Sequence, residues 1–118
     1  MNTKVLLADD QMKVRSALRL LLEQESDFVV SGETADATGL LLAVTEKEPD
    51  LLLLDWELPG LPTAQLLRLL KYERPSLKII AMSSHPEVEQ QVINAGAHAF
   101  LSKSVTPETV LAVIRSLA

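Results

Sequence analysis

The chain has 118 residues, of which 47% are apolar and 23% charged, the size and balance of one folded domain. It has no cysteine, which excludes a disulfide framework, a thiolate zinc site and a cysteine nucleophile. Its net charge of −5 disfavours direct binding of nucleic acid by this domain. The apolar runs, of about five residues at most, are too short for a membrane span or a secretory signal, so we expect a cytoplasmic location.

The first half of the chain alternates short apolar runs with amphipathic ones. Residues 4–8 predict a buried strand, and residues 12–25 a helix with one apolar face. Residues 28–32 predict a second strand that ends at its glycine. A helix is expected over residues 36–47, because a residue that precedes proline disfavours the α conformation. Residues 51–54 are four leucines, predicted as a strand from the flanking proline and aspartates.

The second half continues the alternation. A helix is expected over residues 63–74, a strand over 77–82, and a fourth helix from Pro86 to Ala95 with Gly96 as its C-terminal signal. A short strand at residues 98–101 precedes a last helix, which begins at Thr106-Pro107-Glu108 and runs to the end of the sequence. Five strand–helix units predict an α/β fold with a parallel sheet covered on both faces.

Polar side chains follow four of these strands directly. Ligands bind at the carboxyl ends of parallel strands, and right-handed crossovers place those ends along one edge. We therefore expect one crevice to contain the groups that follow the strands: Asp9 and Asp10, Asp55, Ser83, and Ser102 with Lys103.

Three clustered carboxylates stay ionised together only if a cation neutralises them. Oxygen ligands without cysteine or paired histidine predict a hard ion, most simply Mg²⁺. Such an ion beside Lys103 and Ser83 would bind a phosphoryl group, and Asp55 would be its carboxylate acceptor.

These residues resemble the receiver domain of two-component response regulators. The resemblance rests on Asp9-Asp10, on Asp55 within LLLLDWELPG, on Ser83 within IIAMSS, and on AGAHAFLSK at residues 95–103. It covers residues 1–118 as a single receiver domain. It implies a flavodoxin-like (βα)5 fold, a doubly wound five-stranded parallel sheet with strand order 2-1-3-4-5, as in chemotaxis regulators.

The resemblance implies a role for each residue of the crevice. Asp55 would accept a phosphoryl group from a histidine kinase or a phosphotransfer protein. Asp9, Asp10, Asp55 and the backbone carbonyl of Glu57 would hold Mg²⁺, with Asp9 acting largely through water. Lys103 would contact the phosphoryl group.

The resemblance also implies a conformational switch. The Ser83 hydroxyl would move to the phosphoryl group, and the Phe100 ring would turn inward to fill the vacated space. Plain core packing is the alternative for Phe100. Glu57 and His85, each two residues beyond a site residue, would adjust the lifetime of the acyl phosphate.

Two residues next to the crevice have simpler interpretations as well. Asp10 could cap the first helix as well as bind metal. Trp56, adjacent to the acceptor, is expected to form a lid over the crevice. Departures from the family pattern are Ser104 where proline is common, Pro62-Thr63 in the turn after Asp55, and Phe100 in place of tyrosine.

The function predicted is a phosphorylation-activated signalling switch that acts on an output domain or target protein, with a homodimer on phosphorylation left open and no membrane contact. The opening at residues 9–15 resembles regulators that carry a helix-turn-helix output domain. The alternative is a Mg²⁺-dependent phosphohydrolase with an aspartyl-phosphate intermediate, with Glu57 at the general acid/base position. A third hypothesis, an interaction module without phosphorylation, is disfavoured by the intact acidic and lysine residues.

Overall fold

The computed structural model describes residues 2–118, which form a parallel sheet between two layers of helices. The strands are β1 (Thr3–Ala8), β2 (Phe28–Thr34), β3 (Leu51–Asp55), β4 (Lys78–Ser83) and β5 (Ala99–Ser102). The helices are α1 (Met12–Glu23), α2 (Ala37–Lys47), α3 (Thr63–Glu73), α4 (Glu89–Asn94) and α5 (Pro107–Leu117), and a 3-10 turn, η1 (Pro86–Val88), precedes α4.

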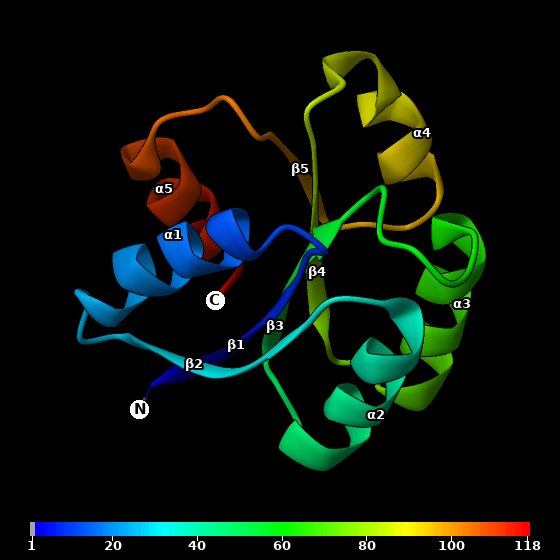
Figure 1. Cartoon of the computed structure of the whole chain (residues 1–118), viewed down its shortest axis with the longest axis horizontal. Coiled ribbons are helices and arrows are strands. Elements are labelled where there is room, and N and C mark those ends of the chain that lie inside the picture. Colours follow the sequence, from blue (N-terminus) through cyan, green and yellow to red (C-terminus); the bar gives the residue numbers. More distant parts are fainter. Residues whose placement is uncertain (1) are drawn as a thin grey trace.

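The strand order is β2-β1-β3-β4-β5 and every pairing is parallel, so the predicted doubly wound fold is confirmed. Helices α1 and α5 cover one face of the sheet, and α2, α3 and α4 cover the other (Figure 1). The order reverses between β1 and β3, where two neighbouring strands continue to opposite sides of the sheet. The crevice of such a fold lies at the carboxyl ends of these strands.

The central strand β3 shows why a run of leucines forms a strand here. Leu52 and Leu54 pack into the core under α2, α3 and α4, whereas Leu51 and Leu53 pack into the core under α1 and α5. Successive side chains of a strand point to opposite faces, so a strand covered on both sides is apolar throughout. This burial positions Asp55 as the last residue of the strand.

The main differences from the prediction concern β2 and the region of α4, and other elements shift by one or two residues at their ends. β2 continues through Gly32 to Thr34, because Gly32 lies at an irregularity in the register with β1 rather than at the strand end. A Cβ at Gly32 would lie 3.3 Å from Leu6 Cδ1, a close approach typical of glycine at a bulge. The expected helix over 86–95 divides into η1 and the six-residue α4.

Several predicted helix ends are confirmed. The Thr106 side chain accepts a hydrogen bond from the Thr109 amide at the start of α5. Gly96 has φ 111° just after α4, a conformation that glycine adopts readily. Asp36 caps α2 rather than forming its first residue, through a 2.7 Å bond from the Gly39 amide.

Within residues 2–118, none of the helices has both the length and the apolar character that crossing a lipid bilayer requires.

Candidate functional site

The loop after β1 fixes the first of the predicted acidic residues. The Asp9 amide donates to the Thr34 carbonyl of β2 at 3.0 Å, and Asp9 Oδ1 accepts from the Gln11 amide at 2.9 Å. The Arg15 guanidinium donates to the Asp9 carbonyl and pairs with Glu33 at 3.0 Å. Asp9 is therefore held through its amide, its carbonyl and its carboxylate. The next residue, Asp10, is exposed to solvent.

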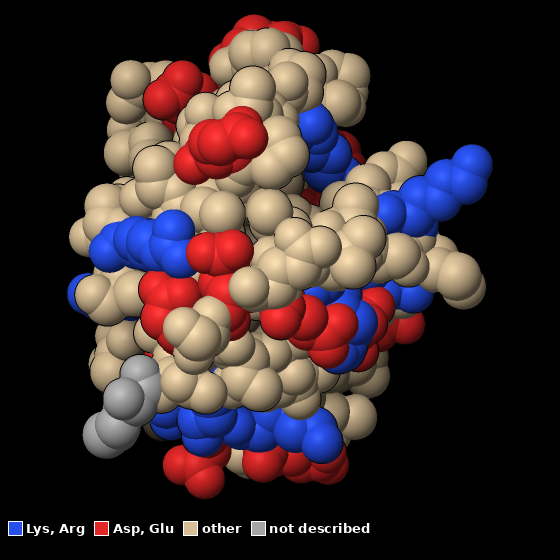
Figure 2. All heavy atoms as spheres, turned by 90° about the vertical axis from the view of Figure 1, so that its left-hand side faces the viewer, with Lys and Arg blue, Asp and Glu red and all other residues tan. Residues whose placement is uncertain are grey.

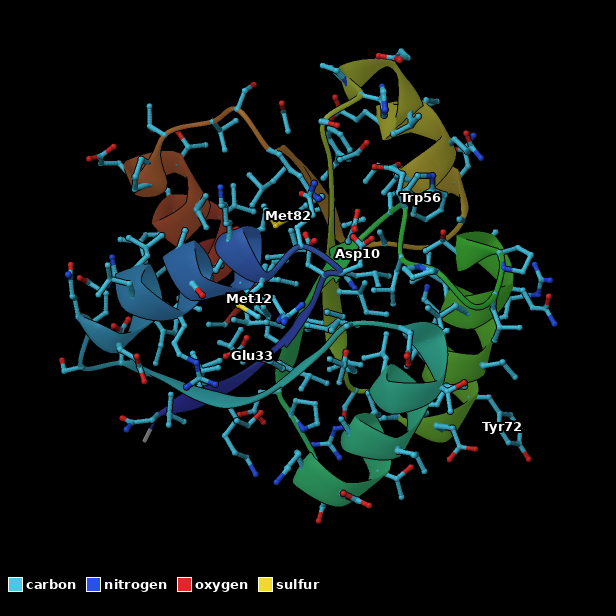
Figure 3. The ribbon with its side chains drawn as sticks, viewed as in Figure 1. Asp10, Met12, Glu33, Trp56, Tyr72 and Met82 are labelled. Carbon is cyan, nitrogen blue, oxygen red and sulfur yellow. The ribbon has the colours of Figure 1, made fainter. Side chains whose placement is uncertain are left out.

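Three carboxylates meet at this edge as predicted. One oxygen each from Asp9, Asp10 and Asp55 lies within 4.8 Å of the others. Asp9 and Asp55 are buried, whereas Asp10 is exposed at the carboxyl end of β1 (Figure 3). Lys103 reaches in from the loop after β5, with Nζ 2.9 Å from Asp9 Oδ2 and 3.3 Å from Asp55 Oδ1.

The environment shifts the ionisation of this cluster. Burial raises the pKa of Asp55 to about 6, and the charge of Asp9 adds to the shift. The Glu57 amide, 3.0 Å from Asp55 Oδ1, and the Lys103 charge oppose it. Burial alone would lower the pKa of Lys103, but its bond to Asp9 and the charge of Asp55 outweigh burial, so this pKa is raised. The site therefore holds a firmly charged lysine beside a buried carboxylate, Asp55, whose charge is costly without a further cation.

The chemistry of these groups fits a hard divalent cation. The carboxylates border a hollow of about 240 Å³ lined by Asp10, Gln11, Asp55, Glu57, Ser84, His85 and Lys103. Oxygen ligands are those that Mg²⁺ takes, usually together with several waters, and the open side at Asp10 leaves room for them. The cluster can thus hold a metal ion, with Mg²⁺ the simplest choice.

Ser83 is a buried polar residue at the end of β4 that is joined to Glu57. Its hydroxyl donates to Glu57, with Oγ–Oε distances of 3.0 and 3.1 Å, and accepts from the His85 amide at 3.0 Å. Its carbonyl accepts from the Lys103 amide at 2.9 Å. Ser83 is completely buried, and these bonds join the ends of β3, β4 and β5.

Phe100 lies on the same face of the sheet as Ser83. Phe100 pairs with Ala81 in the β4–β5 ladder, and Ala81 precedes Ser83 by two residues. Residues two apart on a strand point to the same face. The ring is partly buried and packs against the core under α2, α3 and α4.

Two expectations for residues next to the crevice, Trp56 and Asp10, are wrong. Trp56 is only 8% exposed and belongs to the core on the α3–α4 side of the sheet, so it is not a lid over the crevice (Figure 3). Asp10 does not cap α1, whose N-cap is Gln11 without a side-chain hydrogen bond.

Sequence reasoning missed two features of the site. The first is Arg15, which ties the Asp9 carbonyl to Glu33. The spacing of Arg15 and Arg19, four residues apart on one helix face, is the signal that could have suggested a shared acidic partner. The second is the hydrogen bond between Ser83 and Glu57. These residues lie 26 positions apart in the sequence, and no local pattern connects them.

The chain matches a known protein family over almost its whole length. The sequence model of the response regulator receiver domain matches residues 5–115. The transcriptional activator protein ExaE of Pseudomonas putida is 32% identical over 113 residues, which are 94% of this chain and 53% of ExaE. The chain spans about half the length of the curated relatives it matches.

Solved structures give the same result. A two-component response regulator of the LuxR family from Aurantimonas is 25% identical with a TM-score of 0.90, over 99% of this chain and 85% of that one. RcsB from Salmonella enterica, bound to a promoter in the presence of the phosphomimetic BeF₃⁻, is 26% identical with a TM-score of 0.89, over 99% of this chain and 60% of that one.

Proposed function

Because the chain belongs to the response regulator receiver family, we propose that Asp55 is its phosphoryl acceptor and that phosphorylation there acts as a signalling switch. The observation that carries the proposal is the placement of Asp55. It is buried at the end of β3, within 4.8 Å of two further carboxylates and 3.3 Å from the Lys103 ammonium.

We infer a task for each group during transfer from the contacts it makes. Asp55 Oδ1 carries the contacts from the Glu57 amide and Lys103, so we expect Oδ2 to attack phosphorus. A P–O bond to Asp55 forms as the P–N bond of a phosphohistidine donor breaks, and the imidazole leaves with the electron pair. Lys103 then faces the added negative charge on the phosphoryl oxygens.

Asp9, Asp10 and Asp55, with the backbone carbonyl of Glu57, are the groups we assign to Mg²⁺. The ion would supply positive charge for the phosphoryl oxygens and for the three carboxylates. Asp9 is held by Lys103, and Asp10 faces the open side. This arrangement supports direct ligation by Asp10 and an outer role for Asp9.

The switch pair would be Ser83 and Phe100, which point to the same face of β4 and β5. The Ser83 hydroxyl would donate to a phosphoryl oxygen, and the ring would move into the space beside β4. Phosphorylation would then favour one of two arrangements at the α4–β5–α5 side of the domain.

We propose that a histidine kinase or phosphotransfer protein supplies the group and that an output domain or target protein receives the signal. The relatives of about twice this length include a transcriptional activator, and the longer RcsB is bound to a promoter. Both observations support a DNA-binding output domain. Acidic and basic side chains are interspersed on the face covered by α1 and α5 (Figure 2), and the net charge is −5. Both features support nucleic-acid binding through another domain rather than this one. The homodimer on phosphorylation and the cytoplasmic location stay predictions.

The test is the intact mass of the protein after incubation with acetyl phosphate and Mg²⁺. We expect the gain of one phosphoryl group, lost with EDTA and in Asp55→Asn, which keeps the shape of the side chain. An adduct that persists in Asp55→Asn would overturn the assignment. Many turnovers of a simple phosphate ester would favour the phosphohydrolase alternative over a domain that catalyses only its own phosphorylation and hydrolysis.

We further propose that Glu57 and His85 set the lifetime of the phosphorylated form. Both line the hollow beside Asp55, from which a water molecule would reach the phosphoryl group. Glu57→Asn and His85→Ala are expected to change the dephosphorylation rate by several-fold. The measurement follows loss of the phosphoryl mass with time, and rates equal to that of the parent protein would contradict this role.

A further inference from the structure

The hydroxyl of Ser83 has both of its hydrogen-bonding capacities in use. It donates to the Glu57 carboxylate and accepts from the His85 amide, with all three distances between 3.0 and 3.1 Å. A hydroxyl carries one hydrogen, so it donates to one acceptor group at a time. Ser83 cannot donate to a phosphoryl group on Asp55 while it donates to Glu57.

We propose that Glu57 is a positioning residue that competes with the phosphoryl group for the Ser83 hydroxyl. This inference rests on the proposed function of Asp55. Glu57 lies two residues after the acceptor, and its side chain spans from β3 to the end of β4. The bond between Glu57 and Ser83 therefore favours the arrangement without the phosphoryl contact, and phosphorylation must break it.

The hydrogen bond between Ser83 and Glu57 is strong enough to hold the hydroxyl but weak enough to be replaced by a phosphoryl group. A carboxylate acceptor makes a charge-assisted hydrogen bond, which is stronger than a bond to a neutral amide. Glu57 is exposed, so water solvates its carboxylate once Ser83 has left. When Ser83 leaves, Glu57 is not a buried charge without a partner. The bond therefore shifts the equilibrium toward the arrangement without the phosphoryl contact but does not prevent the other arrangement.

The backbone of Glu57 couples this bond to the acceptor. The Glu57 amide donates to Asp55 Oδ1 at 3.0 Å, while its side chain accepts from Ser83. One residue thus holds the acceptor carboxylate and the switch hydroxyl at the same time. A change at Asp55 that moves this peptide also moves the partner of Ser83.

Glu57 also brings a negative charge near the site, and this charge alone would weaken binding of an anion. A double-mutant cycle separates the two effects, because only competition for the hydroxyl requires Ser83. If Glu57 acts through Ser83, its removal has a larger effect in the parent protein than in Ser83→Ala. A pure charge effect is equal in both backgrounds.

The experiment measures the affinity for beryllofluoride, a phosphoryl mimic, in the presence of Mg²⁺. The fraction of protein with bound beryllofluoride is measured by ¹⁹F NMR in the parent, Glu57→Ala, Ser83→Ala and the double variant. Glu87→Gln is the matched control, since it removes one charge from the neighbouring turn and Glu87 contacts His85 rather than Ser83. We expect Glu57→Ala to bind about fivefold more tightly than the parent, and most of this gain to vanish in Ser83→Ala.

A second readout needs no metal or mimic. The amide signal of His85, which donates to the Ser83 hydroxyl, is expected to shift in metal-free Glu57→Ala and to stay in place in Glu89→Gln, which removes an exposed charge at the start of α4. Equal gains from Glu57→Ala in both backgrounds would overturn the competition. A parent protein and Glu57→Ala that both fail to bind beryllofluoride with Mg²⁺ would instead contradict the proposed function.

Discussion

At the scale of single residues, Asp55 combines two opposed demands. Burial at the end of β3 raises the pKa of Asp55 to about 6. The phosphoryl transfer that we propose needs the ionised carboxylate of Asp55, whose charge burial disfavours. Lys103 and the Glu57 amide stabilise that charge in part, and the proposed cation would supply the rest.

This conflict predicts how stability depends on pH in metal-free protein. The pKa of Asp55 is raised from 3.8 to about 6, so its ionised form destabilises the fold progressively as pH rises through that window. Asp55→Asn removes the penalty and is expected to raise the free energy of unfolding by roughly 2 kcal/mol above pH 7. The gain should shrink from pH 6 downward and almost vanish near pH 4.

Urea unfolding in EDTA at pH 4, 6 and 8 measures this difference. Asp50→Asn is a control, because Asp50 lies at the opposite end of β3 and far from the acidic cluster. A gain for Asp55→Asn that is the same at all three pH values would show that its cause is packing rather than ionisation.

At the scale of elements, strand and helix order could be predicted because hydrophobic periodicity is strong in this chain. The leucines of β3 and the Thr106-Pro107 start of α5 behave as their local chemistry dictates. The deviations arise where tertiary contacts decide. Gly32 is inside β2 because the register with β1 slips there, and the α4 region begins as a 3-10 turn that carries no side-chain cap.

The candidate site shows the same division. Topology places strand ends together, so the sequence sufficed to predict that Asp9, Asp10, Asp55 and Lys103 meet. The bond between Glu57 and Ser83 depends on rotamers and on the spacing of β3 from β4, which no pattern in either segment specifies. The burial of Trp56 likewise depends on where the loop after β3 turns.

At the scale of the whole molecule, the charge distribution links folding to ligand binding. The net charge is −5, and four acidic residues lie in or beside the crevice: Asp9, Asp10, Asp55 and Glu57. Together with Lys103 these residues give the edge a charge of −3, and the remaining chain carries −2. The fold therefore gathers most of its excess negative charge at one edge of the sheet, where like charges repel and the native state is strained electrostatically.

A cation that binds this edge only in the native state must stabilise the entire domain. Saturation at 100 times the dissociation constant contributes about 2.7 kcal/mol, or roughly 10 °C in the melting temperature of a domain this size. We expect MgCl₂ to raise the melting temperature, followed by circular dichroism, in a saturable manner. NaCl at matched ionic strength should raise it less, because screening weakens the repulsion without filling the site.

Asp10→Asn removes an exposed carboxylate of the cluster without leaving a buried group unpaired, so it should reduce the magnesium effect while the variant stays folded. Equal shifts from MgCl₂ and matched NaCl, or an undiminished magnesium shift in Asp10→Asn, would place the stabilisation elsewhere on the surface and argue against a metal site at this edge.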